Sequence, residues 1–264
     1  MLTRIHAEKA SELLWSHWQE GRRLAELPAQ LRPATRAEGY AIQAELEKKS
    51  ALPLFGWKIA ATSVAGQKHI NVDGPLAGRI LAERVRDAAT PVPFGANAMK
   101  VAEAEFAFRF ARDLPPRAKP YTVAEVLDAV ASLHPAIEVP DSRYDDFVKV
   151  GAPQLIADNA CAHDFVLGPA TAADWRSMDL VEHRVKGVVD GKLARDGKGA
   201  NVLGDPRVAL TWLVNELSGL GITLGSSQVV TTGTCVIPLP IDPGDEVVAD
   251  FGALGRLAIR FAEK

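Results

Sequence analysis

The chain has 264 residues, of which 47% are hydrophobic and 24% are charged, and its formal net charge is −3. This is the composition of a globular protein that is long enough for one large domain or two small ones. The slightly negative charge, with both signs interspersed, argues against a nucleic-acid partner, and no apolar stretch approaches the roughly 20 residues that a membrane-spanning helix needs.

The beginning of the chain does not look like a targeting segment. The stretch MLTRIHAEKASELLW is charged and interrupted throughout, unlike the apolar core of a signal peptide. Cys161 and Cys235 do not form a disulfide framework. We therefore expect a cytoplasmic protein with reduced thiols and no membrane partner.

The first fifty residues are predicted to be helical. Apolar residues recur at helical spacing over residues 6–27 and stop at the prolines of PAQLRPAT. A second helix is expected over residues 36–50, with Thr35 as its N-cap and Glu38 at the capping-box position. We expect residues 1–52 to form a helical N-terminal segment.

After Pro53 the sequence changes character. Residues 54–62 (LFGWKIAAT) predict a buried strand, and residues 66–80, with several glycines, are expected to form a loop. Residues 101–110 (VAEAEFAFRF) predict a strand, and residues 123–134 predict a helix that begins at a Thr-x-x-Glu capping box. The segment that begins with PAIEVP is expected to return to strand and loop.

The last third of the chain is expected to be mostly strand. A hairpin is predicted around Asp190 and Gly191, and Asp205 and Pro206 mark the start of a helix. Further strands are expected over residues 227–239, 246–252 and 255–261. The predicted class is α+β, with the helical segment packed on a β-rich body at residues 53–264 as a single functional unit.

Two glutamates in the strand at residues 101–110 suggest a metal site. Side chains alternate along a strand, so Glu103 and Glu105 project from one face while alanines and phenylalanines form a core-facing stripe on the other. A solvated face is the common alternative. However, Glu138 also lies in an apolar setting, and three carboxylates on adjacent strands would suit Mg²⁺ or Mn²⁺.

Two further features have both a structural and a functional interpretation. Lys58 is the single lysine of an apolar strand, so it either reaches water from an edge strand or lies beside an anionic substrate. The bend TTGTC, by itself a weak signal, would let backbone N–H groups approach a ligand. The chain lacks a P-loop, a G-x-S-x-G elbow, a dinucleotide fingerprint and histidine pairs at metal-binding spacing.

Several stretches together resemble a known family. These are GWKIAATS, VDGP, AEAEFAF, AIEVPDSR, IADNA, VKGVVDGKLARDGKGANVLGDP, TTGT and DFGALGRLAIRF, in this order, from about Phe55 to the C-terminus. They resemble the 2-keto-4-pentenoate hydratase / 4-oxalocrotonate decarboxylase family of the fumarylacetoacetate hydrolase superfamily. The resemblance implies a mixed β-sheet body, roll-like or barrel-like, of the fumarylacetoacetate hydrolase C-terminal type.

The resemblance also implies roles for individual residues. It gives Glu103, Glu105 and Glu138 as ligands of Mg²⁺ or Mn²⁺. The remaining implied residues are the catalytic pair Lys58 and Asp73 and the substrate contacts Thr234, Asn159, Cys161 and Arg143. Two departures from the family pattern, Pro140 directly after the ligand segment and Cys161 where many relatives have serine, point to a shifted substrate.

The implied activity is a metal-dependent hydratase of aromatic catabolism. It would add water to a 2-hydroxy-2,4-dienoate and give a 4-hydroxy-2-oxo acid. A decarboxylase of 2-oxo-enedioates and an acylpyruvate-type C–C hydrolase are alternatives, as is a non-catalytic assembly partner. The resemblance further implies a homo-oligomer and a complex with a pathway decarboxylase or aldolase.

Overall fold

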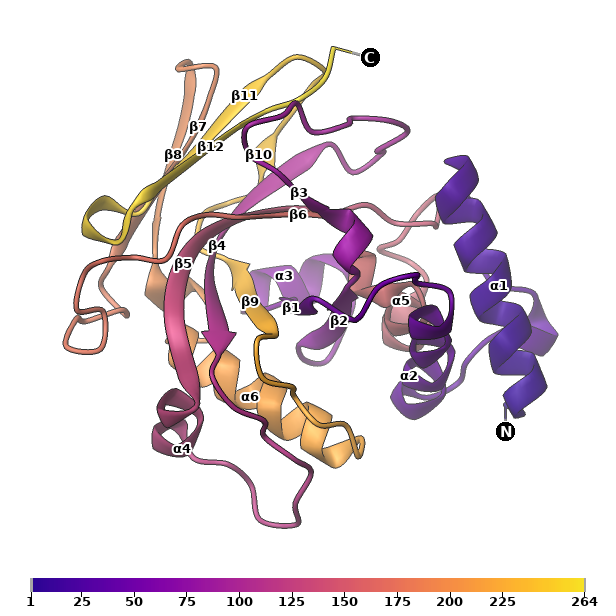
Figure 1. Ribbon diagram of the computed structural model, residues 1–264. Helices are drawn as coiled ribbons and strands as arrows, with labels where there is room; N and C mark the ends of the chain where they lie inside the picture. The colour runs from indigo at the N-terminus through magenta and orange to yellow at the C-terminus, as the bar shows by residue number, and fades with distance from the viewer. Residues whose placement is uncertain (1, 264) are drawn as a thin grey trace.

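The computed structural model describes residues 2–263 and combines two β-sheets with helices (Figure 1). The helices are α1 (Arg4–Glu20), α2 (Arg36–Ala44), α3 (Val64–His69), α4 (Val123–Asp128), α5 (Gly151–Ala157) and α6 (Pro206–Gly219). Short 3-10 helices lie at Ala29–Leu31, Glu45–Lys48, Ala82–Arg84, Asn159–Cys161, Gly199–Asn201 and Gly252–Leu254. None of the helices in residues 2–263 is long and apolar enough to span a bilayer.

The larger sheet has eight strands in the order β2-β1-β9-β4-β5-β6-β3, with β10 paired to β4. Its strands are β1 (Gly56–Ala60), β2 (Leu76–Ile80), β3 (Val85–Arg86), β4 (Val101–Phe110), β5 (Val130–Val139), β6 (Asp164–Leu167), β9 (Val229–Thr234) and β10 (Leu239–Pro240). Parallel pairs (β1–β9, β3–β6) and antiparallel pairs (β4–β5, β4–β9) make the sheet mixed. The predicted α+β class with a mixed sheet is confirmed.

A second sheet of four strands lies at the side of the molecule opposite α1 (Figure 1). It has the order β12-β11-β7-β8, formed by β7 (Arg184–Val189), β8 (Leu193–Lys198), β11 (Glu246–Asp250) and β12 (Arg256–Arg260). The predicted turn between β7 and β8 is confirmed, because Asp190 and Gly191 both have positive φ angles, of 50° and 66°.

The two long central strands organise the core. One face of β4 buries the predicted stripe of Ala102, Ala104, Phe106, Phe108 and Phe110 in the main hydrophobic cluster. The ring of Phe108 packs edge-on against Trp175, with ring centroids 5.7 Å apart. The opposite face of β4, in contrast, carries the two glutamates.

Helix α2 begins where the sequence predicts, whereas α1 begins at Arg4 and ends at Glu20 instead of covering residues 6–27, because Gly21 adopts a left-handed conformation that ends the helix. The Thr3 and Thr35 side chains accept hydrogen bonds from backbone N–H groups at the starts of α1 and α2. Ala10 and Leu14 of α1 share a hydrophobic cluster with Tyr144 and with Ala157 of α5. The N-terminal helices therefore pack against the later part of the chain. The boundary at residue 52 stays a prediction.

Two further segments differ from the sequence-based expectation. The helix expected over residues 123–134 is confirmed only in its first turns, with the Thr122 capping box, because residues 130–134 pair with β4 as the start of β5. Residues 66–80, expected as a loop, contain most of α3 and all of β2. Gly78 is needed for packing there, since a Cβ atom would lie 2.5 Å from the Asn159 carbonyl oxygen.

We expect Phe108→Ala to lower the free energy of unfolding by about 3–5 kcal/mol, because it removes a fully buried ring and leaves a cavity. Urea unfolding at a fixed protein concentration measures this loss. Val208→Ala, at a position that is 45% exposed on α6, should change stability by less than about 0.5 kcal/mol. Equal effects of the two substitutions would contradict this description of the core.

Candidate metal centre and active-site cavity

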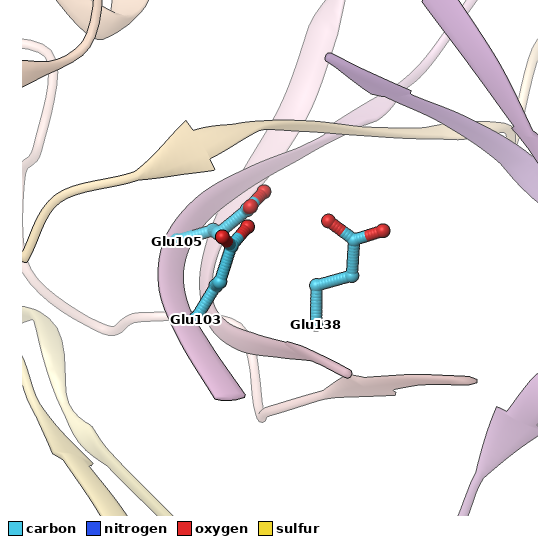
Figure 2. A group of neighbouring side chains, drawn as sticks. All are labelled: Glu103, Glu105 and Glu138. Carbon is cyan, nitrogen blue, oxygen red and sulfur yellow. The ribbon is translucent and has the colours of Figure 1, made fainter. Parts of the chain in front are cut away.

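Strand register brings three carboxylates together. In the antiparallel pair β4–β5, Glu103 lies directly opposite Glu138, and Glu105 lies two residues further along the same face of β4. One carboxylate oxygen from each residue lies within 4.8 Å of the others. Figure 2 shows the carboxylates converging on a common space from two neighbouring strands. Like charges directly opposite each other on a sheet repel, so this pairing needs a compensating positive charge.

Strand β9 orients Glu105 from the side. The Thr231 hydroxyl and the Gly233 N–H group both donate to Oε2 of Glu105. The other oxygen, Oε1, is buried and has no hydrogen-bond partner among the described residues. A buried carboxylate oxygen without a donor is costly, and coordination to a cation would satisfy it.

Lys58 is buried beside the carboxylates and does not reach water from an edge strand. Its Nζ lies 3.1 Å from Oε1 of Glu138 and donates to the Ala160 carbonyl oxygen at 3.0 Å. Burial disfavours its charged form, but the nearby glutamates, led by Glu138, outweigh burial and raise the pKa of Lys58. The second oxygen of Glu138, Oε2, is buried and unpartnered like Oε1 of Glu105.

Full ionisation of the three carboxylates requires a positive charge in addition to Lys58. Burial and the neighbouring carboxylates raise the pKa of Glu105 well above its usual range, and burial raises that of Glu138 to about 7. Three ionised carboxylates and one ammonium leave a charge of about −2 in a buried setting. A divalent ion would neutralise this charge and satisfy both orphaned oxygens. The residues present therefore fit a hard divalent cation such as Mg²⁺ or Mn²⁺.

Through Glu103, the carboxylate cluster borders a cavity of about 840 Å³. Lys58, Glu103, Cys161 and Thr234, all predicted from the sequence, line it. The Thr234 hydroxyl donates to the Val236 carbonyl oxygen at 2.7 Å. Burial raises the pKa of the Cys161 thiol to about 12, which favours the neutral thiol, a weak hydrogen-bond donor.

Asn159 positions the site from outside the cavity lining. Its side chain accepts from the Arg79 N–H group at 2.6 Å and donates to the Arg79 carbonyl oxygen at 2.8 Å. Residues 159–161 all have positive φ angles, of 56°, 51° and 61°, a conformation rare for residues other than glycine. The bond to Arg79 fastens this turn to β2, and the turn presents the Ala160 carbonyl oxygen to Lys58. The structure thus places Asn159 as a support of Lys58.

Two other predicted site residues lie away from the carboxylates. The Asp73 side chain is 81% exposed, pairs with Arg36 at 3.0 Å and does not line the cavity. Arg143 forms a buried ion pair with Asp158 and donates to the Ala162 carbonyl oxygen at 3.0 Å. Arg143 lines a second cavity, of about 330 Å³. The structure brings neither Asp73 nor Arg143 to the carboxylates.

The groups that hold the glutamates and the lysine in place have little or no sequence signal. Thr231 and Gly233 lie in the TTGT bend, which by itself indicates only that the backbone can approach a ligand closely. The Ala160 carbonyl oxygen is a backbone atom of a residue without a polar side chain, so no pattern could have identified it. The close packing of Gly233 against Thr62 also cannot be predicted from the sequence. A Cβ atom at Gly233 would lie 2.2 Å from the Thr62 hydroxyl oxygen.

The second cavity is lined by arginines that keep a histidine neutral. Trp18 Nε1 donates to Nδ1 of His163 at 2.7 Å, so this nitrogen must carry a lone pair. Burial, followed by the positive charges of Arg84, Arg143, Arg86 and Arg23, lowers the pKa of His163 to about 2. Asp164 lies 3.6 Å from its other ring nitrogen and does not reverse this shift.

The chain has relatives of recorded activity. The model of the fumarylacetoacetate hydrolase C-terminal family matches residues 35–262. A 2-keto-4-pentenoate hydratase of Burkholderia vietnamiensis is 33% identical over 227 residues, which cover 85% of each chain. A 2-hydroxyhexa-2,4-dienoate hydratase of Comamonas testosteroni is 29% identical, with 97% of each chain covered.

A solved structure shares the fold over the whole chain. The 4-oxalocrotonate decarboxylase of Pseudomonas putida G7, complexed with magnesium and adipate, superposes with a TM-score of 0.89. The two chains are 25% identical, and 99% of each is covered. The likeness therefore includes the N-terminal helices as well as the sheets.

We expect Glu105→Gln to weaken Mn²⁺ binding by at least about tenfold, because it replaces a charged carboxylate with an unpartnered oxygen by a neutral amide. Even the loss of a residue that only hydrogen-bonds to a metal ligand typically lowers metal affinity by this factor. Isothermal titration calorimetry with the metal alone measures the affinity. Glu182→Gln, at a surface carboxylate paired with Lys198, is the matched control and should bind as the wild type does. Unchanged affinity in the Glu105 variant would exclude this metal site.

We expect the stability of the protein to fall as the pH drops below about 6.5, in part through His163. The unfolded histidine takes up a proton near its ordinary pKa of about 6.5, whereas the folded one stays neutral down to about 2. Between these values the unfolded state binds more protons, so acid favours unfolding.

Urea unfolding at pH 7.5 and pH 5.5 measures this contribution. Wild type should lose about 1 kcal/mol more than His163→Gln over this interval. His6→Gln, in the first turn of α1, is the control and should lose as much stability as the wild type does. An identical loss in wild type and His163→Gln would show that His163 does not stay neutral in the folded protein.

Proposed function

Because the chain belongs to the fumarylacetoacetate hydrolase C-terminal family, we propose that it is a divalent-metal-dependent hydratase of 2-hydroxy-2,4-dienoates. Its relatives named 2-keto-4-pentenoate hydratase and 2-hydroxyhexa-2,4-dienoate hydratase support this activity. The product would be a 4-hydroxy-2-oxo acid, formed in the breakdown of aromatic compounds.

One observation carries the proposal. Two orphaned carboxylate oxygens, on Glu105 and Glu138, belong to a cluster with a buried lysine that lines a cavity large enough for an organic acid. Glu103, which lines that cavity, completes the acidic cluster. This arrangement suits a substrate whose carboxylate and neighbouring oxygen chelate a divalent ion.

The metal and the protein would divide the chemistry. With the ion held by Glu103, Glu105 and Glu138, the site would supply a Lewis acid that stabilises negative charge at the substrate C2 oxygen. The first chemical step moves a proton from the 2-hydroxyl group to C5 and gives a 2-oxo-3-enoate. In the second step the oxygen of water adds to C4 and a proton adds to C3. Both steps need a group that delivers or removes protons near the substrate.

Lys58 is the side chain that we assign to proton delivery and charge stabilisation. An ammonium has three N–H donors, and the contacts with Glu138 and the Ala160 carbonyl oxygen use two of them. The third N–H remains for a substrate oxygen or for proton transfer in the cavity, and the raised pKa keeps the group charged. Asp73 has no part in this assignment, because its side chain lies outside the cavity lining.

The decarboxylase reading remains the second candidate. The structural likeness to 4-oxalocrotonate decarboxylase favours it, and loss of CO₂ would use the same electron sink at the C2 oxygen. Mg²⁺ or Mn²⁺ as the bound ion, a homo-oligomeric assembly, a pathway decarboxylase or aldolase as partner and a cytoplasmic location are further parts of the proposal.

We expect purified protein with Mg²⁺ to remove the ultraviolet absorbance of 2-hydroxypenta-2,4-dienoate and to form 4-hydroxy-2-oxopentanoate. EDTA should abolish the reaction, and Lys58→Met should lower kcat by about 10²–10⁴-fold, the range for loss of a proton-transfer group. Lys198→Met, at a surface ion pair, is the matched control. Release of CO₂ from 4-oxalocrotonate, without hydration of the dienoate, would favour the decarboxylase instead.

A further inference from the structure

We propose that the apolar lining of the active-site cavity selects dienoates with an extended apolar substituent on C5 and rejects those with a second carboxylate. This inference rests on the proposed function, since it concerns the same cavity.

Apart from Lys58 and Glu103, the lining of the cavity is mostly apolar. Its larger apolar side chains include Ile70, Met99, Phe147, Val236, Ile237 and Pro238, and its polar ones include Thr62, Ser63, Asn201 and Thr234. The lining includes two basic side chains, Lys58 and His69, and Lys58 is already bound to Glu138 and Ala160. His69 lies at the end of α3 with its ring edge-on to Phe147, at a centroid distance of 6.3 Å.

A second substrate carboxylate would be poorly accommodated against these walls. A carboxylate that leaves water needs a cation or several donors, and no arginine lines the cavity. The Asn201 amide and the Thr234 hydroxyl already donate to the carbonyl oxygens of Cys235 and Val236. The decarboxylase structure that shares this fold was solved with adipate, a dicarboxylate. The apolar walls of the present chain instead match a hydrocarbon substituent.

The size of the cavity supports a larger substrate than a five-carbon acid. Pockets of about 300–1,000 Å³ bury drug-sized ligands, and this cavity measures about 840 Å³. A five-carbon dienoate held at the carboxylate cluster would leave most of the apolar walls against water. Each additional methylene group buried there should improve recognition by about fourfold.

Ile237 marks where the substituent would lie. This side chain is 70% exposed although it lines the cavity, whereas the adjacent Val236 is buried. Backbone contacts fix the segment, because the Cys235 N–H group donates to Ala104 of β4 at 2.8 Å. Because this segment is already ordered, ligand binding costs little conformational entropy there. The apolar area of Ile237 that a ligand covers would therefore add to the binding affinity.

The test is a series of 2-hydroxy-2,4-dienoates with hydrogen, methyl, ethyl, propyl, phenyl or carboxylate on C5. With wild-type protein and Mg²⁺, kcat/KM should rise by about fourfold per methylene over at least the first two additions. The carboxylate substrate, followed for both water addition and CO₂ release, should react at least about tenfold less efficiently than the methyl one. A flat or falling alkyl series, or efficient use of the carboxylate, would overturn the proposal.

Two substitutions at Ile237 sharpen the test. Ile237→Ser should reduce the advantage of the propyl substrate over the unsubstituted one. Ile237→Arg should raise the relative efficiency of the carboxylate substrate, because it adds a cation at the cavity wall. Val208→Ser, at an exposed apolar residue of α6 that does not line the cavity, is the matched control and should leave the whole series unchanged.

A binding measurement separates this inference from the proposed hydratase activity. Calorimetry with the Mn²⁺-loaded protein and saturated 2-oxo acids of five to nine carbons does not depend on turnover. Affinity that increases with chain length, together with absence of hydration, would support the apolar subsite and reject the hydratase. Affinity independent of chain length would reject the subsite even if the five-carbon dienoate is hydrated.

Discussion

The repulsion among three clustered carboxylates, two of them buried, is the constraint around which this molecule is organised. Glu103 and Glu138 face each other across β4 and β5, and Glu105 lies beside them. A sheet does not keep like charges in this arrangement without compensation. Lys58 compensates one charge, the donors of Thr231 and Gly233 hold one oxygen, and the remaining negative charge is what a divalent ion would neutralise.

The surrounding fold keeps these groups in place at some conformational cost. The turn at residues 159–161 lies in the left-handed region throughout, and such strain persists only where neighbouring contacts enforce it. Asn159 provides that contact through both polar atoms of its amide and the backbone of Arg79. Gly78 allows the turn to approach β2 closely. Together these contacts place the Ala160 carbonyl oxygen where it orients the lysine.

The site could be predicted to the extent that it follows from strand periodicity. A two-residue spacing places Glu103 and Glu105 on one face, and an apolar setting for Glu138 suggests a neighbouring buried strand. The residues that do not reach the carboxylates are those in loops and turns. Asp73 faces water and Arg143 pairs with Asp158, and neither direction follows from a local pattern. The resemblance to a family indicates that such residues matter, but not where this chain places them.

The sequence by itself determined the class of fold, the caps of several helices and the β7–β8 turn, and it identified the three glutamates of the acidic cluster. These features depend on residue spacing and on the backbone conformations that neighbouring residues allow. Only the tertiary structure decided that residues 130–134 form a strand, since pairing with β4 outweighs their local helical pattern. It also decided which carboxylate oxygens are left without donors and which walls of the cavity are apolar. These properties arise from contacts between segments far apart in the chain, so no single stretch of sequence contains them.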